Sequence, residues 1–165
     1  MPLAYFLSVT LHVLAAMLWL GGMFFLAVVG APVLRKVQPL ALRAELFEKI
    51  GVQFRWVGWT AIGVLIVTGI LNLQYRHLLG SGVMGTAAFW SSAYGHALAW
   101  KLGSVTVLIL LSLVHDFVIG PRASRYPAGS AEASRYRRLA AWMARASVLV
   151  GIVLVLAAVR VARGG

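Results

Sequence analysis

The sequence predicts an all-α integral membrane protein, an antiparallel bundle of four transmembrane helices in a single domain of residues 1–165. Of its 165 residues, 61% are hydrophobic, and the mean hydropathy is +0.89, far above the roughly 45–50% apolar usage of soluble domains. A helix crosses ~30 Å of hydrocarbon with about 20 apolar residues. Four segments are long enough: about 3–30, 56–75, 97–119 and 139–162. The short connections between them favour antiparallel neighbours.

The distribution of basic residues predicts the orientation of the bundle. The net charge is +11, and the first and third connections hold most of it. By the positive-inside rule these connections lie in the cytoplasm, and both termini lie outside a bacterial-type inner membrane. Such a pattern indicates topology and contact with the lipid bilayer rather than with nucleic acid. The basic residues of the two connections are Arg35, Lys36, Arg43, Lys49, Arg55, Arg122, Arg125, Arg135, Arg137 and Arg138.

The first helix has no basic segment before it, since the first Lys or Arg is Arg35, so we expect it to be retained rather than cleaved. It is expected to end near Gly30-Ala31-Pro32, because proline stops helical hydrogen bonding. Residues 40–54 place Leu and Phe at helical spacing between charges. That amphipathic pattern predicts either an interfacial helix or a cytoplasmic extension of the second span.

The remaining elements follow from aromatic belts and loop composition. The second span opens with Trp56 and closes with Tyr75, an aromatic residue at each interface. Residues 78–95 are rich in Gly and Ser, and we expect this loop to fold over the external mouth of the bundle. The fourth span follows a loop rich in Pro, Gly, Ser and Arg. We find no internal repeat in the residue identities.

Ionisable side chains in the outer half are the candidate functional residues. His12 lies ~13 Å below the external surface by the helical rise, and His77, His96 and Lys101 fall in the same half. A charged residue in a span costs at least ~2.5–3.5 kcal/mol, so such residues usually face the bundle interior and have a function. His115 lies ~14 Å deeper than His12, too far to share one metal. It is expected at the cytoplasmic interface in a local pair with its neighbour Asp116, and the alternative is that it marks a second site.

Residue types and spacing leave three interpretations open. The absence of cysteine excludes thiolate sites and c-type haem attachment. A neutral imidazole ligates haem iron well, and the two propionates of haem b would need cations such as Lys101 and Arg76. Copper would instead need several histidines and thioethers. In the third interpretation His12 only bonds a neighbouring helix and Lys101 extends outward. The candidates for copper are His12, His77, His96, Met17, Met23 and Met84.

Several other residues are candidates for supporting roles around a bound group. His96 or His77 is the candidate second axial ligand. Asn72 and Tyr94 have side chains that can hydrogen-bond a bound group, although a polar contact between helices, worth ~1 kcal/mol or less, explains either residue equally well. Small residues on the second span would also permit a homodimer.

Three stretches together resemble the copper resistance D (CopD) family of membrane proteins over about residues 3–120. "LHVLAAMLWLGGMFFL" is similar to its first-helix motif, "RWVGWTAIGVLIVTGILNLQYR" to its next helix with the ending TGxLN at residues 68–72, and "SAYGHALAWKLGSVTVLIL" to its YGxxLxxKL segment. The resemblance implies copper uptake beside a periplasmic copper-binding partner. The chain has half the spans of the long members and no Met/His-rich periplasmic segment, which weakens that implication. His96 stands where the family pattern has Arg.

His12 on the first helix and Lys101 on the third also resemble, more loosely, the HemJ-type protoporphyrinogen oxidases, which are four-helix proteins associated with haem b. We therefore interpret the chain as a haem-b-binding protein with a redox or electron-transfer role at the extracytoplasmic side, working with a redox partner. The residues do not decide whether it is a haem-dependent oxidoreductase. The alternatives are a copper transport or resistance permease and an assembly subunit without a cofactor.

Overall fold

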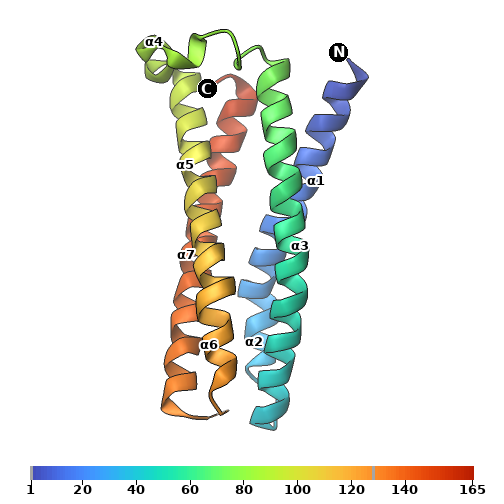
Figure 1. Cartoon of the computed structure of the whole chain (residues 1–165), viewed down its shortest axis with the longest axis vertical. Helices are drawn as coiled ribbons and strands as arrows, with labels where there is room; N and C mark the ends of the chain where they lie inside the picture. Colours follow the sequence, from blue (N-terminus) through green and yellow to red (C-terminus); the bar gives the residue numbers. More distant parts are fainter. Residues whose placement is uncertain (1, 128) are drawn as a thin grey trace.

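The computed structural model describes residues 2–127 and 129–165, and in these ranges the chain forms helices and loops without strands. Figure 1 shows two helix pairs, in which α1 (Leu3–Phe25) packs along α3 (Leu40–Tyr75) and α5 (Ala93–Val114) along α7 (Ala131–Arg163). This confirms the predicted all-α, four-span membrane fold. The helical stretches long and apolar enough to cross a membrane are Leu3–Leu34, Leu40–Tyr75, Ala93–Ala123 and Ala131–Arg163.

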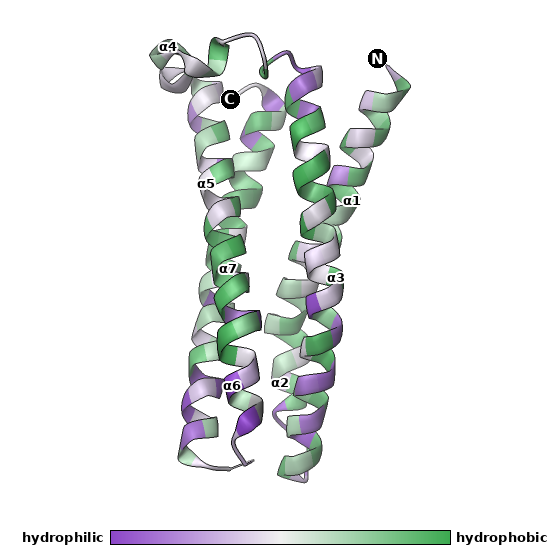
Figure 2. Ribbon diagram, viewed as in Figure 1, coloured by the Kyte–Doolittle hydropathy of each residue, from purple (hydrophilic) through white to green (hydrophobic). Residues whose placement is uncertain are grey.

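The two ends of the bundle differ in charge. Both termini lie at one end, together with the connection between α3 and α5 (Figure 1), and we call this the terminal end. The connection 35–39 and the described residues 126, 127, 129 and 130 of the connection to α7 lie at the other end, which we call the basic end. Figure 2 shows that hydrophilic residues gather toward the basic end, while the middle of the bundle is hydrophobic.

Two π turns lengthen the spans at the basic end. The turns and the short helices that follow them are η1 (Leu26–Gly30), α2 (Ala31–Leu34), η3 (His115–Ile119) and α6 (Gly120–Arg125). Pro32 and Pro121 each occupy the second position of the short helix. Proline lacks an N–H and its ring clashes with the carbonyl four residues back, and the wider π turn relieves that clash. The first span therefore continues to Leu34 instead of ending near Gly30-Ala31-Pro32.

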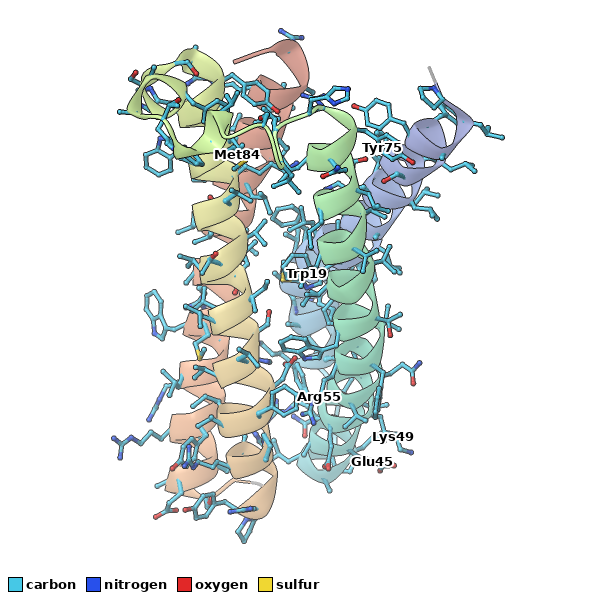
Figure 3. The ribbon with its side chains drawn as sticks, turned by 45° about the horizontal axis from the view of Figure 1, so that its top comes forward. Trp19, Glu45, Lys49, Arg55, Tyr75 and Met84 are labelled. Carbon is cyan, nitrogen blue, oxygen red and sulfur yellow. The ribbon has the colours of Figure 1, made fainter. Side chains whose placement is uncertain are left out.

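The first part of α3 contains residues 40–54. The sequence left open whether this stretch is an interfacial helix or an extension of the second span, and in the structure it runs on without a break into Tyr75. Its exposed Glu45 and Lys49 form an i,i+4 ion pair of 2.7 Å, a spacing that supports a solvent-facing helix surface. Figure 3 places both residues near the basic end of α3.

The two helix pairs repeat one construction, which the residue identities do not reveal. When the two π turns are aligned, three buried positions of α1 fall on three buried positions of α5, and His12 falls on Lys101. The pairs are Ser8 with Ala97, Ala15 with Ser104, and Trp19 with Leu108. Buried residues of α3 and α7 share a spacing as well: Gly58, Ala61 and Thr68 against Gly151, Leu154 and Val161. Burial is repeated while residue type is not.

An apolar layer in the middle of the bundle joins the two pairs. Trp19 is 3% exposed and Leu108 is 0% exposed. Gly58 leaves room for the indole, since a Cβ there would lie 3.6 Å from Trp19 Cδ1. Figure 3 shows Trp19 between the helix pairs. The buried members of this layer, which we call the core layer, are Ala15, Trp19, Leu20, Ala61, Ile62, Leu108 and Leu154.

The loop after α3 folds onto the terminal end, as its composition predicts. It contains the short helices η2 (Val83–Gly85) and α4 (Ala87–Ser91). Met84 and Phe89 pack against a second buried cluster made by Ala97, Leu98 and Val161. Trp90 donates from Nε1 to the Met84 carbonyl over 2.7 Å. The loop is therefore attached to α5 and α7.

Leu108→Ala should destabilise the bundle, because it removes a fully buried side chain from the core layer. Such truncations cost about 2–5 kcal/mol in well-packed cores. Thermal unfolding in detergent micelles measures the loss. Leu110→Ala is the matched control, since Leu110 lies on the same helix and is 56% exposed. Equal melting temperatures for the two variants would contradict the assignment of the core layer.

Candidate cofactor site

The imidazole of His12 is held between α1 and α3. Its Nδ1 lies 2.8 Å from Thr68 Oγ1, and Thr68 is 5% exposed. The ring lies against α3 at Gly69, where a Cβ would be 3.5 Å from His12 Cε1. The packing of α1 on α3 thus fixes both the position and the orientation of the ring.

The Thr68 hydroxyl determines which nitrogen of His12 carries the proton. Thr68 Oγ1 donates to the Val64 carbonyl over 2.6 Å, and a hydroxyl has a single hydrogen to donate. It must therefore accept from His12, so Nδ1 is the protonated nitrogen. Nε2 is left with its lone pair, the arrangement typical of metal-binding histidines.

A second polar contact lies one turn nearer the terminal end. Ser8 is 5% exposed, and its Oγ donates to Asn72 Oδ1 over 2.9 Å. Asn72 thus makes the contact between helices that the sequence offered as the alternative to ligand binding. Its amide nitrogen keeps two hydrogens that can still donate.

Lys101 lies on the buried stripe of α5, at the position that corresponds to His12 on α1. It is half-buried, and His12 and Arg76 both lie within range of its charge. Within residues 2–127 and 129–165 it has neither a hydrogen bond nor an ion pair. An ammonium held in a span without an anion is costly, which is why such residues usually have a partner.

Arg76 follows the last residue of α3 and links the two helix pairs at the terminal end. Its Nε donates to Tyr5 Oη and its Nη1 to Tyr94 Oη, each over 3.2 Å. Its guanidinium also lies 5.9 Å from the centre of the Tyr94 ring. The hydrogen bond from Arg76 to Tyr5, supported by the one to Tyr94, raises the pKa of Arg76 above its ordinary value. Arg76 is therefore a permanent cation.

No side-chain carboxylate is available to these cations. The chain has four acidic residues, and all of them belong to the basic end: Glu45, Glu48, Asp116 and Glu132. Positive charge around His12, Lys101 and Arg76 is therefore not balanced by any acidic side chain. We call these three residues with Thr68 the outer cluster. Its chemistry favours an anionic ligand.

His77 and His96 are not gathered around His12. His77 follows α3 with a φ of 55°, and both side chains are exposed. His96 lines a groove of about 530 Å³ between α5 and α7, together with Trp100 and Gly103. The helical period explains this, because His96 directly precedes buried Ala97 and so points to a different face from Lys101. In the part of the chain described, no three His, Cys, Asp or Glu residues form a metal-binding group.

A polar group near the basic end was missed in part by the sequence analysis. His115 Nδ1 lies 2.9 Å from Asp116 Oδ1, as the adjacent residues suggested. The unexpected member is Trp59, whose Nε1 donates to Asp116 Oδ2 over 3.0 Å. Arg55 lies one turn before Trp59 on α3. This i,i+4 spacing of an arginine and an aromatic residue was the sequence signal that could have pointed to the polar group.

Comparisons with known proteins identify the family to which the chain is similar. The family model described as Copper resistance protein D matches residues 48–160. An uncharacterized protein of Aquifex aeolicus (strain VF5) is 30% identical over 155 residues, which cover 93% of this chain and 92% of the relative. No solved structure matches.

Thr68→Val should allow the proton of neutral His12 to occupy either Nδ1 or Nε2. The variant keeps the shape of the side chain and loses the acceptor for Nδ1–H. Nitrogen-15 NMR of histidine-labelled protein distinguishes the two neutral tautomers. We expect the Nδ1–H tautomer in the wild type and a mixture in the variant. Thr60→Val is the control, since the exposed Thr60 hydroxyl makes the same bond to its own helix without touching His12. A wild type with the proton on Nε2 would contradict the assignment.

Proposed function

The chain belongs to the copper resistance protein D family of multi-pass bacterial inner-membrane proteins, and from that premise we propose that it binds haem b through His12. The bound group would serve redox or electron-transfer chemistry. We place the terminal end on the extracytoplasmic side, on the basis of the basic residues at the opposite end. The family itself supports a membrane protein related to copper resistance.

The observation that carries the proposal is the unbalanced positive charge beside an imidazole with an available Nε2. Haem iron takes a neutral imidazole as axial ligand, and His12 presents one whose other nitrogen is tied to Thr68. The two propionates of haem b are carboxylates, for which cations are the strongest hydrogen-bond donors. Lys101 and Arg76 are the nearby cations and lack acidic side chains as partners.

The roles of the residues follow from this arrangement. His12 would hold the iron, Thr68 would keep the imidazole in the ligating tautomer, and Lys101 and Arg76 would hold the propionates. Tyr5 and Tyr94 would keep Arg76 at the mouth between the helix pairs. The group supplies one-electron exchange at its iron when bound, and the protein supplies position and charge. No second protein ligand for the iron is assigned, because the exposed His77 and His96, the candidates from the sequence, are not gathered around His12.

Copper transport is the second candidate, because the family description favours it. The outer cluster does not fit a resident bare copper ion. It offers one imidazole, and the charges of Lys101 and Arg76 repel a cation. The thioethers are elsewhere: Met17 is 66% exposed, Met23 packs on the core layer, and Met84 packs under the loop. Copper would therefore be a cargo that passes through other conformations.

His12→Ala should abolish the bound cofactor, because the iron loses its protein ligand. The visible spectrum of purified protein, before and after reduction, and the pyridine haemochrome measure haem per chain. We expect a Soret band that shifts on reduction in the wild type and at least a tenfold lower haem content in the variant. His96→Ala, which changes an exposed histidine of the same half, separates the effect of His12 from a general loss of imidazole.

Three outcomes distinguish the candidate functions. Full haem retention in His12→Ala refutes the ligand assignment. A colourless wild type with stoichiometric copper by elemental analysis supports transport. A wild type with neither group supports an assembly subunit without a cofactor.

Lys101→Met should weaken haem retention without changing the axial-ligand spectrum, because it removes a propionate partner and leaves the imidazole in place. A charge-assisted hydrogen bond is worth about 1.5–3 kcal/mol, so we expect the haem dissociation rate to rise roughly 10–150-fold. Transfer of haem to excess apomyoglobin measures that rate. Lys49→Met is the control, since Lys49 is exposed and pairs with Glu45 at the basic end. An unchanged rate in Lys101→Met would remove Lys101 from the site.

A further inference from the structure

Arg55 holds a buried polar atom that nothing in the protein satisfies. It lies on α3 near the basic end, and its Nε is buried without a hydrogen-bond partner, the one such side-chain atom found in the described ranges. A buried donor left unpaired costs about 1–3 kcal/mol, and more when the group is charged. In Figure 3 Arg55 lies between the helix pairs, on the side of α3 that faces α6.

The guanidinium of Arg55 lies beside Phe117 and Gly120. Arg55 Cζ lies 5.7 Å from the centre of the Phe117 ring, so one face of the guanidinium rests on an aromatic residue. Gly120 lies next to it without a side chain, and a Cβ there would be 3.6 Å from Arg55 Nη2. The guanidinium is thus supported by an aromatic ring and meets no side chain at Gly120.

The nearest acidic residue is already committed. Both carboxylate oxygens of Asp116 accept hydrogen bonds, Oδ1 from His115 and Oδ2 from Trp59. On α3 itself, Glu45 pairs with Lys49. No ion pair joins Arg55 to any carboxylate in the described part of the chain. The positive charge of Arg55 therefore lacks a counter-ion of its own.

The corresponding positions in the two helix pairs show that the fold does not need Arg55, Trp59 or Asp116 to be polar. When the buried positions are aligned, Arg55 and Trp59 correspond to the aliphatic Val148 and Ile152 on α7, and Asp116 corresponds to Ala27 in η1. The π turn forms in both pairs, because each has its proline. Arg55, Trp59 and Asp116 are thus an addition, since the corresponding position of the opposite pair is apolar in each case.

We propose that Arg55 binds a phosphate oxyanion that enters between α3 and α6 from the basic end. The planar guanidinium presents paired N–H groups that match phosphate oxygens, and the unpartnered Nε is one of them. The basic residues around this end attract anionic lipids, so the expected source is a phospholipid headgroup. Free phosphate would offer the same oxygens.

Thermal unfolding of the purified full chain in a neutral maltoside detergent tests the proposal. We expect added phosphatidylglycerol to raise the melting temperature of the wild type by about 3–6 °C, the scale of ligand stabilisation for a chain of this size. Diacylglycerol, which lacks the phosphate, should give no such rise. Inorganic phosphate alone distinguishes the sources, because an equal rise with it indicates a free anion and no rise indicates a lipid headgroup.

Arg55→Gln should lose the rise, and Arg145→Gln should keep it. Arg145 is the matched control, since its guanidinium also lies over an aromatic ring, 4.9 Å from Trp142, but the residue is exposed. Arg55→Lys keeps the charge but lacks the paired N–H groups of the guanidinium, so it should retain less than half of the rise in melting temperature. This variant replaces Arg55→Gln in the test if Arg55→Gln does not fold. An absent rise in the wild type, or the same rise in all Arg55 variants, would overturn the proposal.

Discussion

The single proton of the Thr68 hydroxyl is the constraint on which the outer cluster depends. That proton goes to the Val64 carbonyl, so the oxygen must accept from His12, and the imidazole is left with Nε2 available. Thr68 belongs to the same buried stripe of α3 as Gly58 and Ala61, the surface on which α1 packs. The contact that seats Trp19 against Gly58 therefore also seats His12 against Thr68, and packing and ligand chemistry are set together.

Function in this chain is found where one helix pair departs from the other. The two pairs share their π turns, their prolines and the spacing of their buried residues, so these features belong to the fold. His12 corresponds to Lys101, Thr68 to Val161, and Asp116 to Ala27, and each replacement changes polarity or charge. The duplicated frame thus supplies an internal control, because at Thr68 and at Asp116 the apolar residue of the other pair shows what the bundle needs and the polar residue shows what has been added to it.

Hydropathy and the basic residues were sufficient to predict four helices and a membrane location, since a span needs only length and apolar composition. The continuation of helix one past Pro32 was not predictable, because a proline in sequence reads the same whether it ends a helix or follows a π turn. Depth along a helix put His12 and Lys101 in the same half of the bundle. It failed to place His96, because depth says nothing of which face a residue occupies. The pairing of Trp59 with Asp116 joins different helices, and no local pattern encodes it.

The core layer of Trp19, Leu108 and their neighbours separates the polar groups at the terminal end of the bundle from those at the basic end. An ion or a proton that moves along the axis must exchange one set of polar contacts for another, and the core layer is apolar throughout. An electron needs no such contacts, because it crosses a thin insulating layer by tunnelling. The core layer therefore interrupts any polar path for ions or protons along the bundle axis, and electron transfer of the proposed kind would not need such a path.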